Sequence, residues 1–222
     1  MAEFDRYSQN YRAMLEGSLA MAGGGAAYYL EAKARWLVQN THQPYEKILD
    51  FGCGVGLLAH YLKKQFPRAQ IHGYDPSEDS LAQIPATLKD GALFTPRLEE
   101  LETDYDLAVL SNVLHHIPPP QRRETLRDVL SRLKQNGLLC IFEHNPLNPL
   151  TRWVVNHCPF DEHAVLLYPA EIQAYFESLM VADFRKRYFL FFPAFLRRLA
   201  PLERAMAWFP AGAQYAVIGE KR

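Results

Sequence analysis

The sequence predicts an α/β fold with a mostly parallel sheet and helices on both faces. Short apolar runs alternate with amphipathic segments of about 10 to 15 residues, which is the pattern of βαβ units. A glycine cluster, Gly52, Gly54 and Gly56, directly follows the first of these runs. A length of 222 residues with 49% hydrophobic content fits one domain that can bury a core.

The first 44 residues predict an N-terminal helical segment. Phe4, Tyr7 and Tyr11 recur at helical spacing and predict a first amphipathic helix, which the glycines at 23–25 interrupt. A second apolar stripe predicts a helix from Ala26 to Val38.

Residues 45–145 predict the core of the domain. The expected strands are Lys47–Phe51, Ile71–Asp75, Ala92–Phe94, Tyr105–Asn112 and Leu138–Phe142. The expected helices run from Val55 to Phe66, from Pro76 to a limit at Pro85, and through Leu126 and Leu133 to an end at Asn136 and Gly137. The strand and helix order implies parallel crossovers.

The rest of the chain is less regular. We expect an ordered insertion at 146–168, a helix at Pro169–Leu179, a strand at Ala182–Phe192, a helical segment at Ala194–Phe209 broken near Pro201, and a last strand at Gln214–Gly219. We treat residues 1–222 as one domain, with 146–168 and 193–210 as cap or substrate insertions.

The charge balance disfavours a nucleic-acid partner for the chain as a whole. Twenty-four basic residues oppose 25 acidic ones, a formal net charge of −1. Residues 183–209 differ, because six basic residues oppose two acidic ones beside an aromatic side. This basic segment can contact a membrane surface, an anionic substrate or a second subunit, or it can bury its apolar side on its own sheet.

The chain is expected to lie in the cytoplasm, as a monomer or a homodimer. Its three cysteines are too scattered for a disulfide framework, and the N-terminus does not fit a signal peptide. The longest apolar run, Tyr188–Leu196, is well short of the roughly 20 residues of a membrane-spanning helix.

The glycine cluster predicts a ligand site. Glycines at alternate positions after a strand let the backbone turn tightly and approach a ligand. A dinucleotide site would use G-x-G-x-x-G, whereas this chain has G-x-G-x-G with Asp50 two residues before it. A carboxylate in that place repels phosphate and suits an ammonium group, so a nucleoside joined to an amino acid fits better. The alternative is a tight turn without a ligand.

Asp75 strengthens this interpretation, because it ends the next strand, where a carboxylate can accept both hydroxyls of a ribose. The segments ILDFGCGVG, IHGYDPS and DLAVLSNVLHHI, in this order, resemble the class I S-adenosylmethionine-dependent methyltransferases. The final segment QYAVIGEK resembles the antiparallel last strand of that family's Rossmann-like, seven-stranded sheet.

The resemblance implies S-adenosyl-L-methionine as the cofactor, with S-adenosyl-L-homocysteine as the product. By position in the motifs, the implied cofactor-binding residues are Asp50, Gly52, Cys53, Gly54, Gly56, Asp75, Pro76, Arg97, Leu98, Asn112 and Val113. Tyr11, with Tyr7, can form a lid on the cofactor or pack as an ordinary helix face.

Methyl transfer to a hydroxyl or a protonated amine benefits from a general base, and histidine suits that role. His144 and His116 are the candidates, while a packing or capping role for His115 and His116 stays open. Glu143 can cap a helix or bind substrate. We expect no metal, because the histidines and cysteine at 144, 157, 158 and 163 match no standard zinc spacing.

The sequence therefore predicts a methyltransferase that acts on the oxygen or nitrogen of a small-molecule acceptor. A non-catalytic S-adenosylmethionine-binding protein or partner subunit is the alternative, and a nicotinamide oxidoreductase is a third hypothesis. An RNA acceptor is disfavoured, because no long basic surface is encoded outside 183–209.

Overall fold

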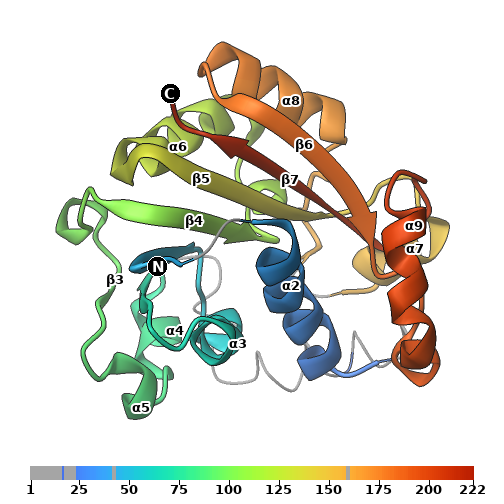
Figure 1. Cartoon of the computed structure of the whole chain (residues 1–222), viewed down its shortest axis with the longest axis horizontal. Helices are drawn as coiled ribbons and strands as arrows, with labels where there is room; N and C mark the ends of the chain where they lie inside the picture. The colour runs from blue at the N-terminus through green and yellow to red at the C-terminus, as the bar shows by residue number, and fades with distance from the viewer. Residues whose placement is uncertain (1–16, 18–23, 42–43, 159–160) are drawn as a thin grey trace.

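A single sheet of seven strands organises the described part of the chain, which comprises residues 17, 24–41, 44–158 and 161–222 of a computed structural model. The strand order is β3-β2-β1-β4-β5-β7-β6 (Figure 1). The strands are β1 (Lys47–Phe51), β2 (Gln70–Tyr74), β3 (Phe94–Thr95), β4 (Tyr105–Ser111), β5 (Leu133–His144), β6 (Ala182–Phe189) and β7 (Gln214–Glu220). Only β7 is antiparallel to its neighbours among these strands, which confirms the predicted sheet.

Helices cover both faces of the sheet. They are α2 (Ala26–Asn40), α3 (Leu57–Gln65), α4 (Glu78–Ala82), α5 (Ala86–Lys89), α6 (Pro119–Arg132), α7 (Pro149–Asn156), α8 (Pro169–Ser178) and α9 (Glu203–Met206). Side chains of a strand alternate between faces. Ile48 therefore packs in the apolar cluster of α2 and α3, while Leu49 packs in that of α6 and α8.

The carboxyl end of β1 is where the strand order reverses. β1 lies between β2 and β4, so Phe51 pairs with Tyr74 on one side and Leu110 on the other. The α3 crossover covers one face and the α6 crossover covers the opposite face. In open α/β sheets such a reversal leaves a crevice at the carboxyl ends of the strands. The predicted site residues follow these strand ends.

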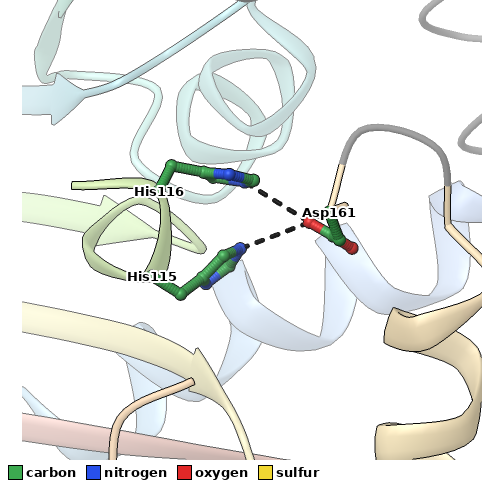
Figure 2. Close-up of side chains that lie close together, drawn as sticks. All are labelled: His115, His116 and Asp161. Atoms are coloured by element: carbon green, nitrogen blue, oxygen red, sulfur yellow. Dashed lines mark ion pairs between the residues drawn. The ribbon is translucent and has the colours of Figure 1, made fainter. Parts of the chain in front are cut away.

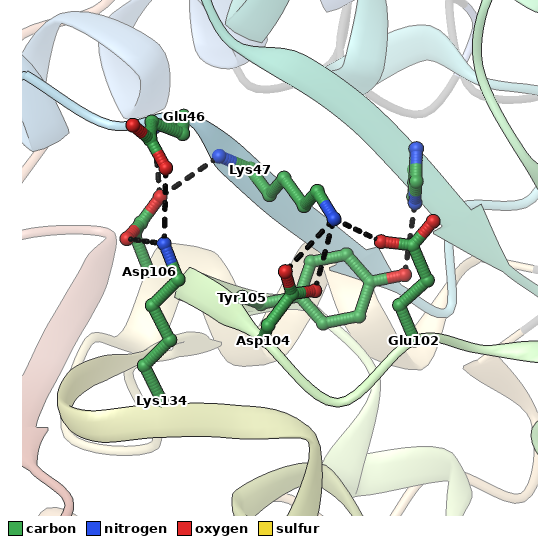
Figure 3. A network of polar contacts seen from close by, with 8 residues as sticks. Glu46, Lys47, Glu102, Asp104, Tyr105, Asp106 and Lys134 are labelled. Atoms are coloured by element: carbon green, nitrogen blue, oxygen red, sulfur yellow. Dashed lines mark hydrogen bonds and ion pairs between the residues drawn. The ribbon is translucent and has the colours of Figure 1, made fainter.

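The amino ends of β1 and β4 carry a network of charges (Figure 3). Lys47 contacts Glu102 and Asp104, and Asp106 accepts hydrogen bonds from the Glu46 and Lys47 amides at 2.7 and 2.8 Å. These groups are largely solvent-exposed, and such ion pairs contribute little each, typically 0–1 kcal/mol. The network ties two strands together at the end of the sheet opposite the crevice.

Several element boundaries differ from the sequence prediction, and two of the differences are instructive. The helix expected to end at Asn136 and Gly137 ends at Arg132, and β5 begins at Leu133. Asn136 has a positive φ of 64° but lies inside β5, where its amide binds the Lys221 carbonyl. The Asn-Gly pair therefore makes an irregularity in the strand, not a helix end. The third strand lies at Phe94–Thr95 instead of Ala92–Phe94.

The basic segment buries only part of its apolar side. Phe189 and Leu190 are buried, and Phe191 packs against the core of the sheet. The segment continues with η6, a 3-10 helix (Ala194–Leu202), and α9, and neither has a buried residue. Phe195 and Trp208 are 76% and 74% exposed, so the expectation that the segment packs its apolar side on its own sheet is wrong for η6 and α9.

Two further predictions concern the N-terminus and membranes. The first amphipathic helix, with Tyr7 and Tyr11, lies outside the described residues. Among the helices that are described, none combines the length and apolar character needed to cross a membrane.

Candidate functional site

The glycine turn after β1 is held by backbone contacts. The Gly52 and Cys53 amides both donate to the Tyr74 carbonyl, at 2.7 and 2.9 Å. Gly52 has φ 79°, and a Cβ there would lie 2.5 Å from a methyl group of Val113. Gly54 has φ 52°, but its Cβ would meet nothing within 4 Å. The turn therefore needs glycine at 52 for packing and leaves open space above Gly54.

Asp75 connects this turn to the end of β2. One carboxylate oxygen accepts the Gly54 amide at 2.8 Å, and the other accepts the Ser77 amide at 3.0 Å. A carboxylate oxygen has two lone pairs, so each can accept a further hydrogen bond. Asp75 is thus oriented by backbone amides at the mouth of the crevice.

Asp50 is a buried carboxylate that lacks a full set of partners. It is 1% exposed, and none of the described residues donates a hydrogen bond to its Oδ2. Burial, then the negative charge of Asp75, raises the pKa of Asp50 to about 7, although Lys33 partly opposes the shift. A buried anion in this state favours a cationic ligand group next to it.

Lys33 lies on α2, and its side chain reaches the carboxyl end of β4. The sequence did not predict it as a site residue. Its Nζ donates to Ser111 Oγ at 2.8 Å and to Asn112 Oδ1 at 2.6 Å. Burial lowers its pKa to about 8, against the opposing charges of Glu143 and Asp50. The Asn112 amide nitrogen lies 2.6 Å from Nε2 of His144, so Lys33 orients His144 through Asn112.

Glu143 organises the histidines at the exit of β4. Its Oε1 accepts the Leu114 amide at 2.9 Å, and its Oε2 lies 2.5 Å from Nδ1 of His115. Leu114 begins the short 3-10 helix η4 (Leu114–His116), so Glu143 caps this turn. Of the two predicted roles for Glu143, the structure supports the capping role.

Asp161 approaches the same turn from the insertion after α7. Its Oδ1 lies 3.5 Å from Nε2 of His115 and 3.4 Å from Nε2 of His116 (Figure 2). Burial lowers the pKa of His115, but the negative charges of Glu143 and Asp161 outweigh it and raise the pKa to about 9.

The two predicted bases lie beside His115. Burial, then the charge of His115, lowers the pKa of His116 to about 3 and that of His144 to about 4. Both rings are therefore neutral near pH 7. Because Nε2 of His144 faces the Asn112 amide, that nitrogen accepts a hydrogen bond in this state.

These side chains surround one cavity of about 580 Å³. Most predicted site residues line it, namely Asp50, Gly52, Cys53, Gly54, Asp75, Pro76, Leu98, Asn112, Val113, His116 and His144. Gly56 and Arg97 are not among the lining residues: Gly56 precedes α3, and Arg97 pairs with Glu100 near the surface. Tyr11 lies outside the described residues.

The cavity also contains residues that sequence reasoning did not assign to the site. They are Tyr29, Leu30, Lys33, Ser111, His115, Cys158, Asp161 and Gln214, among others. The sequence holds a signal for Lys33: it lies four residues from both Tyr29 and Leu37, so a lysine stands on the apolar stripe that α2 buries. Asp161 had none, since it follows an irregular stretch of the insertion.

Comparison with known proteins shows which proteins this chain is similar to. A family model described as a methyltransferase domain matches residues 49–139. Demethylmenaquinone methyltransferase of Thermotoga maritima is 31% identical over 106 residues, which cover 46% of this chain and 45% of that protein. Ribosomal RNA large subunit methyltransferase G of Shewanella frigidimarina is 35% identical over 72 residues, covering 32% and 18%.

The fold resembles solved structures over most of its length. An S-adenosylmethionine-dependent methyltransferase from Archaeoglobus fulgidus superposes with a TM-score of 0.69 at 18% identity, covering 89% of this chain and 95% of that one. The chain spans less than half the length of the two curated relatives described above. Residues 49–139 are therefore similar to a methyltransferase domain, and the seven-stranded sheet has the fold of S-adenosylmethionine-dependent methyltransferases.

Proposed function

We propose that the chain transfers a methyl group from S-adenosyl-L-methionine to a small-molecule acceptor. One observation carries the proposal: the buried Asp50 carboxylate, with no hydrogen-bond donor to Oδ2 among the described residues, faces the same cavity as Asp75. A ligand with an ammonium group and a ribose satisfies both carboxylates. A dinucleotide would instead bring phosphates close to Asp50, which Coulomb repulsion disfavours.

The residues of the glycine turn and of the neighbouring strand ends hold the cofactor in this proposal. Asp50 binds the amino group, and Asp75, which the Gly54 and Ser77 amides orient, accepts the ribose hydroxyls. The open space above Gly54 admits the ligand close to the backbone. Pro76 and Leu98 border the adenine, and Asn112 and Val113 border the methionine part.

The cofactor supplies an electrophilic methyl group, so the protein mainly positions the acceptor and excludes water. A hydroxyl or protonated amine must also lose a proton. The neutral rings of His116 and His144 line the cavity and can take it. His144 does so only when its Nε2 leaves the Asn112 amide.

A small acceptor fits the cavity better than RNA does. Its volume of about 580 Å³ falls within the range of about 300–1,000 Å³ of small-molecule sites. The match to the ribosomal RNA methyltransferase covers only 32% of this chain, and the net charge of −1 offers no general attraction to phosphates.

Isothermal titration calorimetry with S-adenosylhomocysteine tests the proposal. We expect one binding site in the wild type, binding reduced at least tenfold in Asp50→Asn, and no binding of NAD. Binding of NAD without binding of S-adenosylhomocysteine would overturn it.

A second assay separates an enzyme from a binding protein. Incubation with S-adenosylmethionine and a pool of small metabolites should produce S-adenosylhomocysteine above the rate without acceptor. Tight cofactor binding without product from any acceptor class would favour the non-catalytic alternative.

A further inference from the structure

Three side chains beside the cavity have the spacing of metal ligands. Nε2 of His115, Nε2 of His116 and a carboxylate oxygen of Asp161 all lie within 4.8 Å of one another (Figure 2). The two nitrogen–oxygen distances are 3.5 and 3.4 Å. Zinc with bonds of about 2.0–2.1 Å in tetrahedral geometry separates its ligand atoms by about 3.3–3.5 Å. The carboxylate is therefore at the distance from both imidazoles that a shared ion requires.

Nε2 of His115 is buried and faces the Asp161 carboxylate. The side chain is 1% exposed, and Nε2 lies 3.5 Å from Asp161 Oδ1, a contact too long for a good hydrogen bond. A buried nitrogen and a carboxylate oxygen at this separation leave the distance that an ion bound to both atoms would need. This nitrogen points toward Asp161 in Figure 2.

The opposite nitrogen of His115 has the partner that metal-binding histidines usually have. Nδ1 lies 2.5 Å from Glu143 Oε2, and Glu143 is fully buried. A carboxylate in this position holds a proton on Nδ1, and an ion that binds Nε2 would displace the other ring proton. Glu143 and Asp161 together also supply the negative charge that balances a divalent cation.

The fully buried side chain of Arg122 holds the backbone around the three side chains in place. Its Nε donates to the Leu114 and Ile117 carbonyls at 3.0 and 2.9 Å, and its Nη2 donates to the Val165 carbonyl at 2.8 Å. The Val165 amide in turn donates to the His115 carbonyl at 2.8 Å. These bonds join the histidine turn to the segment that carries Asp161, so the three ligands are held by a rigid support.

We propose that His115, His116 and Asp161 bind a divalent transition-metal ion, with Zn²⁺ as the best fit. Two imidazoles and one carboxylate are donors that suit zinc and not magnesium or calcium. All three residues line the cavity, and with His116 as a ligand the remaining candidate for the general base is His144. A site with three protein ligands and one position open to a cavity has the arrangement of a catalytic zinc site.

The role of the ion rests on the proposed function. The open position faces the cavity in which the acceptor would bind, so the ion would anchor a lone-pair donor of the acceptor: an oxygen, nitrogen or sulfur atom. The substrate class is therefore a small molecule that carries a metal-binding heteroatom. No metal was expected from the sequence, because the residues compared with zinc patterns were those at 144, 157, 158 and 163. Of these, His157 and His163 are exposed.

Calorimetry of the untagged, chelator-treated protein with Zn²⁺ tests the site. We expect one equivalent to bind, with affinity reduced at least tenfold in His116→Gln and in Asp161→Asn. His163→Ala is the matched control, because it removes an exposed histidine two residues from Asp161, and its affinity should equal that of the wild type. Glu143→Gln should weaken binding about 10–100-fold, as for other partners of metal-bound histidines.

Co²⁺ and S-adenosylhomocysteine complete the test. Co²⁺ in the wild type should give the visible absorption of a tetrahedral ion, and Asp161→Asn should lose it. No stoichiometric Zn²⁺ binding, or equal binding in all variants, would overturn the proposal. If S-adenosylhomocysteine then still binds, only the metal site fails. If Zn²⁺ binds and S-adenosylhomocysteine does not, the proposed function fails instead.

Discussion

The two halves of the cavity are built differently. In the proposed cofactor half, which comprises residues 50–54 and Asp75, backbone groups define the site: the amides of Gly52 and Cys53 donate to the Tyr74 carbonyl, and the Gly54 amide donates to Asp75. In the proposed acceptor half, which comprises His115, His116, His144 and Asp161, side chains distant in sequence define the site, such as Asp161 beside His115. A backbone-defined site leaves a local motif in the sequence, whereas a site defined by distant side chains does not.

The largest effect should come from breaking the cofactor half at Gly52. Gly52→Ala places a Cβ 2.5 Å from Val113 at a φ of 79°, so we expect a loss of about 2–4 kcal/mol from strain and overpacking. Denaturant unfolding measures it.

Gly54→Ala is the matched control for Gly52→Ala. It has a positive φ of 52°, but its Cβ meets nothing within 4 Å. It should lose only about 1 kcal/mol, while its affinity for S-adenosylhomocysteine should fall because the Cβ enters the ligand space. Equal stability losses in the two variants would contradict the close-approach argument.

Arg122→Leu should break the acceptor half alone. One buried and two partly buried carbonyls lose their charged donor, so we expect a destabilisation of about 2–4 kcal/mol by thermal or denaturant unfolding. Affinity for S-adenosylhomocysteine should stay within about threefold. The control is Arg123→Leu, whose exposed guanidinium contacts only Ser178 among the described residues and should cost less than about 1 kcal/mol. Loss of cofactor binding in Arg122→Leu would show that the halves are not separable.

Asp50 makes the stability of the ligand-free protein depend on pH. Its pKa is about 7 in the folded state against an ordinary 3.8, so the folded state binds the proton more tightly than the unfolded state does. Stability from this group is therefore full below about pH 4 and falls by a few kcal/mol as the pH rises to about 7, after which it is constant.

Unfolding of the wild type and of Asp50→Asn between pH 5 and pH 8 measures this contribution. The variant should lose most of the decline and should be the more stable protein at pH 8. A decline of the same size in both proteins would exclude Asp50 as its source.

The smallest effect should come from the exposed aromatic residues of the basic segment. Trp208 is 74% exposed, so Trp208→Ser should change the free energy of unfolding by less than about 0.5 kcal/mol. Chemical denaturation at two protein concentrations measures this. A larger loss, growing with protein concentration, would mean that this surface is buried in a dimer.

The sequence predicted the fold, and it predicted that the glycine turn and Asp75 meet at one edge of the sheet, for the same physical reason. Strand periodicity, the glycine spacing and Asp75 are local signals, and residues at the ends of adjacent parallel strands meet at one sheet edge. The Asn-Gly pair at 136–137 was wrongly predicted to end a helix, because such a pair can either end a helix or bend a strand. Here the Asn136 amide donates to the Lys221 carbonyl, and the pair bends a strand.

The acceptor half could be predicted only in part. His116 and His144 follow predicted strands, so their approach to one edge was foreseeable. Lys33 and Asp161 reach the cavity through tertiary packing. Lys33 binds Asn112, which lies 79 residues further along the chain, and Asp161 of the insertion approaches His115. No local pattern encodes those contacts, although a lysine on the apolar stripe of a helix is a usable signal.

A crystal structure with S-adenosylhomocysteine bound tests the central claim most directly. The account predicts the amino group within about 3.2 Å of Asp50 Oδ2, the ribose hydroxyls on Asp75, and the sulfur facing the histidines of the acceptor half. A ligand whose amino group lies away from Asp50, or whose sulfur faces away from His116 and His144, would contradict it.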